Sequence, residues 1–208
     1  MSDHCIRSIE PREASLRITL AQGDVLEVRL EGYPRLVGAT PEQLANWKLV
    51  DDGHGVVWPE LRAPTPLGMV NVRDLLWDRR CNEALSRLKA AKFRLDQLSE
   101  DDHDVIALWR LEADINNGGF LQFFSNWADP TCTRALAVLG ALGAKEMHAI
   151  VKRMRGVLER LEQLPESVPL SSIAAHLTAA ESAELQRLDE AFWKYPDRLS
   201  LLATARYP

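Results

Sequence analysis

Glu112 is the side chain whose place in the sequence most suggests chemistry. Apolar residues recur around it at helical spacing, which predicts a helix with Glu112 on its apolar face. A carboxylate in that place acts either as a general base with a raised pKa or as an acceptor for backbone NH groups. Because no His, Cys or Ser stands nearby to complete a catalytic set, we favour the structural role. The apolar residues are Val105, Leu108, Leu111 and Ile115.

A glycine hinge follows this helix. Two Asn and two Gly residues end it, because both types tolerate the left-handed conformation. A second helix then begins at once, and we expect its free NH groups, or an Asn side chain, to bind Glu112. Three aromatic residues at i, i+3 and i+4 predict that this second helix is anchored in the core. The predicted structural hinge consists of Glu112, Asn116, Asn117, Gly118, Gly119, Phe120, Gln122, Phe123, Phe124 and Asn126.

The densest acidic run of the chain precedes the hinge. Ser99 is predicted to cap the upstream helix, with Asp102 three residues later. Acidic residues at a helix N-terminus interact favourably with the helix dipole, and a row of carboxylates also imitates DNA phosphates. Capping accounts for Ser99 and Asp102. Glu100, Asp101 and Asp104 are therefore the candidate partner-binding residues.

No cofactor or metal site is indicated. Cys5, Cys81 and Cys132 are odd in number, widely spaced and without a Cys-x-x-Cys pair, so they are predicted to be reduced thiols. The five histidines are equally scattered. The sequence contains no phosphate loop, dinucleotide fingerprint or nucleophile elbow. We therefore expect a binding protein without a cofactor rather than an enzyme.

The charge of the chain favours a protein partner. The net charge of −5 argues against direct binding to nucleic acid, which needs a basic face. Residues 1–77 hold 8 basic and 11 acidic residues, and residues 78–208 hold 17 and 19, so neither part is strongly acidic. Met1 to Ser15 lacks the pattern of a signal peptide, and no run approaches the ~20 apolar residues of a membrane span. We therefore expect a cytoplasmic protein.

The predicted fold class is α+β, with a small antiparallel β-rich N-terminal domain followed by an all-α helical domain. Alternation over 16–20 and 25–30 predicts one hairpin, and the short runs at 48–50 and 56–58 predict another. From Asp74 onward the spacing of leucines becomes helical. The predicted parts are a flexible N-terminus over 1–14, a β-rich domain over 15–77 and a helical domain over 78–208.

Three aromatic residues of the N-terminal domain have two interpretations. Tyr33, Trp47 and Trp58 are residues on which the bases of single-stranded nucleic acid could stack. No basic cluster is interleaved with them, however, and a domain of this size needs large side chains in its core. We therefore predict that they belong to the core.

The hinge sequence carries a resemblance. Ile115 to Phe120, Gln122 to Phe124, and Asn126 are similar to the signature of the bacterial DNA-mimic-protein family, a family of helical proteins. The match extends loosely from Leu76 to the end of the chain. The resemblance implies a protein that occupies the DNA-binding face of a transcription factor, with carboxylates where phosphates would lie.

The N-terminal domain carries a second resemblance. Its aromatic and proline pattern is similar to that of a small bacterial domain of unknown function, found beside helix-turn-helix segments or in toxin–antitoxin settings. The similarity covers Ile18 to Leu76 and implies a fold but no chemistry. The residues that carry it are Tyr33 to Leu36, Ala39 to Gln43, Asn46, Trp47, Gly55, Trp58 and Pro59.

Three functions follow as hypotheses. The first is a non-enzymatic regulatory protein, a DNA mimic whose partner is a helix-turn-helix transcription factor. The second is an antitoxin or immunity-type protein that neutralises a toxin. The third is an enzyme of unrecognised type centred on Glu112. An acidic helix edge is too short to imitate a groove by itself, so a homodimer is expected to supply a second set of acids.

Overall fold

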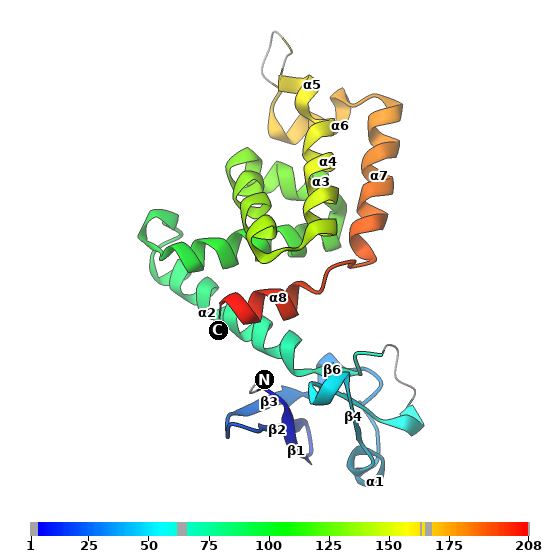
Figure 1. The fold of residues 1–208 in the computed structure, drawn as a ribbon. Helices are drawn as coiled ribbons and strands as arrows, with labels where there is room; N and C mark the ends of the chain where they lie inside the picture. Colours follow the sequence, from blue (N-terminus) through cyan, green and yellow to red (C-terminus); the bar gives the residue numbers. More distant parts are fainter. Residues whose placement is uncertain (1–3, 62–65, 163, 165–167, 208) are drawn as a thin grey trace. The chain divides into compact units, whose positions relative to one another are not determined.

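The computed structural model describes residues 4–61, 66–162, 164 and 168–207. It consists of two compact units, Met1–Asp78 and Arg79–Pro208, and the division falls within helix α2 (Val72–Ala90). The first unit holds antiparallel strands and the second is helical, so the predicted α+β fold class is confirmed (Figure 1).

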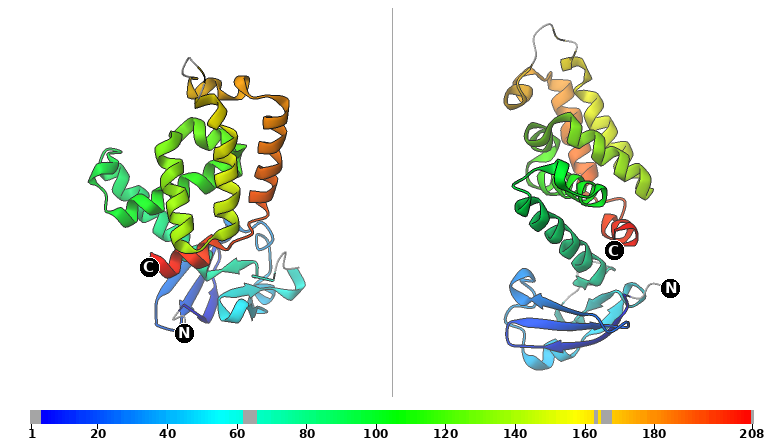
Figure 2. Two further views of the ribbon diagram at one scale, coloured as in Figure 1. Left: turned by 45° about the horizontal axis from the view of Figure 1, so that its top comes forward. Right: turned by 90° about the vertical axis from the view of Figure 1, so that its left-hand side faces the viewer.

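The first unit contains two three-stranded antiparallel sheets, with strand orders β1-β2-β3 and β4-β5-β6. Figure 2 shows these strands in blue to cyan. The two predicted hairpins, β2 with β3 and β4 with β5, are present. The strands are β1 (Ile6–Pro11), β2 (Ser15–Leu20), β3 (Val25–Arg29), β4 (Lys48–Val50), β5 (Gly55–Val57) and β6 (Val70–Asn71). The short helices are η1 (Leu30–Gly32), α1 (Pro41–Ala45), η2 (Asp51–Gly53) and η3 (Pro59–Leu61).

The expectation of a flexible N-terminus over 1–14 does not hold for residues 6–11, which form β1. Residues 1–3 lie outside the described part of the chain, but β1 pairs with β2, and both Ile6 and Ile9 are buried. The register shifts between Ile6 and Ser8. Such an irregularity changes the face on which later residues lie, so the isoleucines share a buried face at a spacing of three. A search for strict alternation does not detect that pattern.

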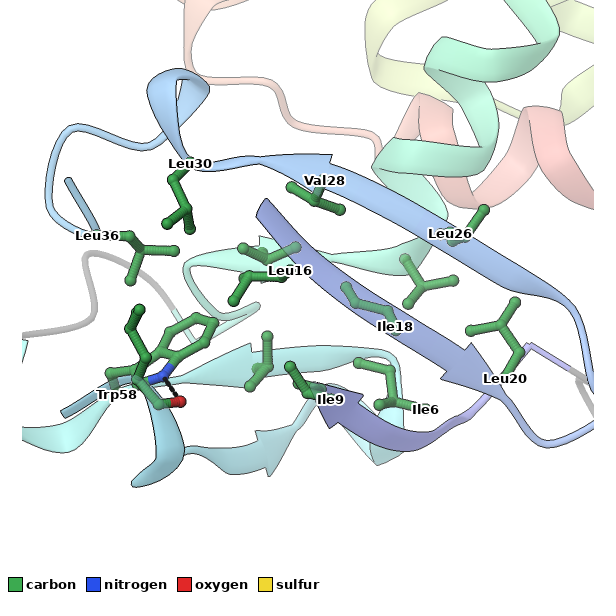
Figure 3. Close-up of a cluster of buried hydrophobic side chains, with 14 of the residues drawn as sticks. Ile6, Ile9, Leu16, Ile18, Leu20, Leu26, Val28, Leu30, Leu36 and Trp58 are labelled. Carbon is green, nitrogen blue, oxygen red and sulfur yellow. Dashed lines mark hydrogen bonds between the residues drawn. The ribbon is translucent and has the colours of Figure 1, made fainter. Parts of the chain in front are cut away.

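The core of the first unit lies against the first sheet (Figure 3). Leu16, Ile18 and Leu20 of β2 are fully buried beside Trp58. The indole Nε1 of Trp58 donates to the carbonyl oxygen of Leu44 at 2.9 Å, which satisfies both buried polar groups. Tyr33 and Trp47 pack against the same cluster. The prediction that the three aromatic residues belong to the core is therefore confirmed.

The second unit is built around packed helices, with α3, α4 and α7 in mutual contact (Figure 1). Helix caps set their ends: Gly143, at φ 73°, ends α3, and Thr178 with Glu181 forms a capping box that begins α7. No described helix has the length and apolar character needed to cross a membrane. Besides α2 and η4 (Leu95–Gln97), the helices are α3 (Glu100–Leu142), α4 (Lys145–Val157), α5 (Glu159–Glu162), η5 (Leu170–Ser172), α6 (Ile173–His176), α7 (Ala179–Trp193) and α8 (Leu199–Arg206).

Candidate functional site

The hinge is the place where α3 loses helical geometry. The backbone leaves the helical range at Gly118 (φ −153°, ψ 21°) and Gly119 (φ 78°, ψ −179°), and again at Ala128 (φ 58°, ψ −173°). The angles of Gly119 belong to a region that is essentially restricted to glycine. The helix therefore stops at the two glycines and restarts at Phe120, as the Asn-Asn-Gly-Gly sequence predicts.

Asp189 of α7 binds the start of the second hinge helix. The backbone N–H of Phe120 donates to Asp189 Oδ1 at 2.9 Å. Burial raises the pKa of Asp189, and the hydrogen bond from the Phe120 amide opposes that rise. We expected Glu112 to accept from the free amides of this helix. That expectation is wrong for the Phe120 amide, because its acceptor is Asp189. The acceptor lies 69 residues further along the chain, so no local pattern could reveal it.

Glu112 instead contacts the segment that follows α7. Its half-buried carboxylate accepts a hydrogen bond from the Tyr195 hydroxyl at 2.5 Å. The indole Nε1 of Trp193 donates to the carbonyl oxygen of Ile115 at 2.9 Å, one helical turn further along. These bonds join the first hinge helix to the last residue of α7 and to the segment that follows it. These contacts support a structural role for Glu112.

Asp114 connects the two hinge helices. Its Oδ1 accepts from Gln122 Nε2 at 2.9 Å, and its Oδ2 accepts from Asn126 Nδ2 at 3.0 Å and from Trp127 Nε1 at 2.5 Å. Asn117 Nδ2 also donates to Gln122 Oε1 at 3.2 Å. The polar signature residues Gln122 and Asn126 therefore share one acceptor across the hinge. Asp114 is a site residue that the sequence analysis did not identify.

Arg110 completes this polar cluster. Its guanidinium lies 3.7 Å from the centre of the Trp127 ring, and the residue is only 8% exposed. Burial lowers the pKa of Arg110, and the nearby charge of Asp114 opposes that change. A cation over an aromatic face is attracted to the ring, and the attraction is larger where the cation is shielded from water. Arg110, Asp114 and Trp127 therefore hold the second hinge helix against the first.

The aromatic residues of the second hinge helix are core residues. Phe120 and Phe123 are fully buried and Phe124 is 7% exposed. The ring centre of Phe120 lies 5.9 Å from that of Phe123 and 5.7 Å from that of Phe124, which is a favourable aromatic spacing. Asn116, Asn117, Gly118 and Asn126 are exposed. The hinge thus has an anchored inner side and a polar outer side.

Two of the three candidate partner-binding acids share one arginine. Arg134 Nη2 donates to Glu100 Oε2 at 2.7 Å, and Arg134 Nε donates to Asp104 Oδ1 at 2.8 Å. The hydroxyl of Tyr207 donates to Asp104 Oδ2 at 2.9 Å. The hydrogen bond from Arg134 lowers the pKa of Glu100. Both carboxylates are therefore partly neutralised within the domain.

Exposure separates the three acids. The side chains of Glu100 and Asp101 are 84% and 56% exposed, whereas that of Asp104 is 22% exposed. Asp101 Oδ1 lies 3.9 Å from Arg206 Nη1, which is a loose pair. The expectation that all three are free to contact a partner is corrected for Asp104, because its two oxygens accept bonds from within the domain.

Comparison with known families assigns both parts of the chain. The family model described as DMP19-like protein matches residues 96–207, which is more than half of the chain. The chain belongs to the DMP19-like protein family. A second model, described as a protein of unknown function (DUF2442), matches residues 6–63. Both resemblances inferred from the sequence are therefore confirmed. No curated protein and no solved structure matches the chain.

The DMP19-like region contains the hinge, together with Glu100, Asp101, Asp104 and the partners of these three acids named above. Ser99 caps α3, since its Oγ accepts from the Asp102 N–H at 3.2 Å. Among the described residues of the whole chain, no group of three or more His, Cys, Asp or Glu side chains is placed to hold a metal ion. The cysteines are not joined in disulfides. The N-terminal end of α3 presents exposed carboxylates, since the side chains of Glu100 and Asp101 are 84% and 56% exposed.

Proposed function

We propose that the protein is a non-enzymatic regulatory protein that binds the DNA-contacting face of another protein. Its carboxylates would take the positions of DNA phosphates, and the partner would be a transcription factor. The observation that carries this proposal is membership of the DMP19-like family across residues 96–207. The acids at the start of α3 supply surface groups of the required charge.

Glu100 and Asp101 are the carboxylates that we assign to this contact. Both are well exposed, and their pairs with Arg134 and Arg206 lie at the surface. Exposed ion pairs contribute roughly 0–1 kcal/mol, so a basic side chain of a partner can replace them at little cost. Arg134 would keep its bond to Asp104 when Glu100 changes partner. Asp104 therefore positions Arg134 and is not itself part of the contact.

The helical domain has only a small surplus of acidic residues, so the proposed contact depends on the few carboxylates that lie in it. Residues 78–208 hold 17 basic and 19 acidic residues, so long-range attraction between this domain and a basic groove is weak. Two carboxylates per chain also cover only a short part of a groove. We propose a homodimer as the source of a second pair of carboxylates.

The test compares two double variants in the full chain. A protein captured from native lysate with the wild-type chain is identified and purified, and its affinity is measured at two salt concentrations. We expect Glu100→Gln with Asp101→Asn to weaken binding about tenfold and to reduce its salt dependence. The matched control is Glu83→Gln with Asp96→Asn, whose side chains are 51% and 65% exposed. The control should leave affinity unchanged.

Competition separates this function from its alternatives. Duplex DNA should displace the protein from a partner whose DNA-binding face it covers. If DNA does not compete and the Glu100 and Asp101 variant binds normally, the mimic proposal is wrong. An antitoxin that contacts a toxin through apolar surface would then be the better hypothesis.

A further inference from the structure

A polar cluster in the first unit is separate from the hinge and from the acids of α3. Cys5 precedes β1, His54 precedes β5, and Arg73 lies in the first turn of α2. Cys5 Sγ lies 3.8 Å from His54 Nε2, and Arg73 Nη2 lies 3.4 Å from the same nitrogen. Cys5 and Arg73 fall outside the residues matched by either family model. The matched ranges therefore include His54 but do not span the whole cluster.

A tightly held turn presents the histidine. Asp51 and Asp52 have positive φ values of 51° and 52°, which are uncommon for residues other than glycine. Asp51 Oδ2 accepts from Asn71 Nδ2 at 2.9 Å and from Arg73 Nη1 at 3.0 Å. These bonds fix the turn in a conformation that costs energy. The hydrogen bonds from Asn71 and Arg73 to Asp51 therefore fix the turn that carries His54.

The hydrogen bonds of His54 define its neutral tautomer. Its Nδ1 lies 3.1 Å from the carbonyl oxygen of Asp51, and a carbonyl can only accept. Nδ1 must therefore carry the hydrogen, which leaves Nε2 as an acceptor directed at the Cys5 thiol and Arg73. His54 is 3% exposed, whereas Cys5 is partly exposed. The base is thus shielded and the sulfur is accessible.

We propose that Cys5 is a reactive thiol that exchanges with small-molecule disulfides. His54 Nε2, 3.8 Å from Sγ, takes the thiol proton and leaves the thiolate, which is the nucleophilic form of cysteine. The Cys5 sulfur attacks one sulfur of the disulfide, and a new sulfur–sulfur bond forms as the old one breaks. The other half leaves as a thiolate and takes up a proton. Cys5 is oxidised and the leaving sulfur is reduced.

The other two cysteines are internal controls. Cys81 is 4% exposed and Cys132 is fully buried. Burial, followed by the charge of Asp129, raises the pKa of Cys132 to about 12, so it is hardly ionised near neutral pH. Disulfide exchange requires an accessible thiolate. In the folded chain the reaction should therefore be confined to Cys5.

The experiment measures the rate of reaction with 5,5′-dithiobis(2-nitrobenzoate), an aromatic disulfide, at pH 7. We expect one thiol of the native chain to react rapidly and Cys5→Ser to abolish that reaction. His54→Asn should slow it about tenfold, because the Asn amide can still donate to Asp51 but offers no imidazole base. His176→Asn makes the same change at an exposed site and should leave the rate unchanged.

Two results would overturn the proposal. One is an equal rate in wild-type protein and in a folded His54→Asn variant, with folding checked by circular dichroism. The other is a native Cys5 rate below that of the same cysteine in the denatured chain. This second comparison needs no change at His54, so it decides the matter even if His54→Asn fails to fold. The difference between the denatured wild-type chain and denatured Cys5→Ser gives the Cys5 rate, because Cys81 and Cys132 also react once the chain is unfolded.

Discussion

At the scale of single residues, the two hinge glycines perform different tasks. Gly119 has a positive φ, and a Cβ there would lie 2.4 Å from Asp189 Oδ2. At Gly118 φ is −153°, and a Cβ would lie 2.1 Å from Gln122 Oε1, which is the end of a flexible side chain. Glycine is therefore required at position 119 both by the positive φ and by the nearby Asp189 carboxylate. At position 118 an added Cβ would conflict mainly with the Gln122 side chain, which can move.

We predict that Gly119→Ala lowers the free energy of unfolding by about 3 kcal/mol and Gly118→Ala by about 1 kcal/mol. Urea denaturation followed by circular dichroism measures both. Gly156→Ala in α4 is the control, since no atom lies within 4 Å of its added Cβ and φ is not positive. It should leave stability unchanged or raise it by up to about 1 kcal/mol. Equal losses at Gly118 and Gly119 would contradict the assignment.

Sequence patterns identified the hinge residues that donate hydrogen bonds, but not the aspartates that accept them. Asn and Gly residues indicate a helix end by their own conformational preferences, so the hinge was predictable. Asp114 and Asp189 bind groups on other helices, and nothing in the types of their sequence neighbours marks them as acceptors. The amides Gln122 and Asn126 were the available signal, because paired amides near a carboxylate suggest a shared bond.

At the scale of elements, Asp102 joins α2 to α3. Its side chain is 6% exposed and contacts Arg80 at 2.8 Å and Arg87 at 2.7 Å. Burial alone would raise the pKa of Asp102, but the hydrogen bonds from Arg87 and Arg80 hold the pKa below its usual range. The sequence assigned Asp102 to helix capping, because its arginine partners on α2 could not be recognised from spacing along one helix.

Asp102→Asn should lower the free energy of unfolding by about 3 kcal/mol at pH 7, because two arginines lose their common anion. An aspartate whose pKa falls on folding contributes stability above its unfolded pKa of about 3.9 and loses that contribution as the pH falls through its folded pKa. The difference in the free energy of unfolding between variant and wild type should therefore become smaller below about pH 4. Urea titrations at several pH values measure this difference, with exposed Asp96→Asn as the control. If the difference in unfolding free energy between the variant and wild type stayed constant below pH 4, the lowered pKa of Asp102 would not be the cause of the stabilisation.

The elements that sequence patterns identified are those with local signals at their ends. Thr40 and Thr178 form capping boxes, and Ser99 and Gly143 cap α3. Strand β6 was missed because its two residues carry no alternation, and its pairing with β5 is a long-range contact. Local chemistry thus predicted the start of α3 at Ser99 and the hinge, whereas β6 depended on its partner β5 elsewhere in the chain.

At the scale of the whole molecule, each unit has buried side chains of its own. The first unit is organised around Trp58 and β2, and the second around the hinge aromatics. Stability in each unit therefore rests on a different set of contacts, and unfolding of the full chain need not be a single event. Substitutions can be placed in one core while the other stays intact.

Trp58→Phe should destabilise the first unit by about 2 to 3 kcal/mol, because it leaves a cavity and an unpaired Leu44 carbonyl. Calorimetry of the full chain should show that one transition moves while the other, which responds to Asp102→Asn, stays in place. If both transitions moved together in either variant, the two units would unfold as one.

The position of β1 has a practical consequence for producing this protein. The strand lies at the edge of its sheet, and β2 lies between β1 and β3. A recombinant chain trimmed to begin at Ser15 would lack β1 and would leave the backbone donors and acceptors of β2 open along one side. Such an edge is a template for pairing between copies, and Leu20 and Ile18 would lose their neighbours Ile6 and Ile9. Purification tags and protease sites therefore belong before residue 4, where they leave the first sheet complete.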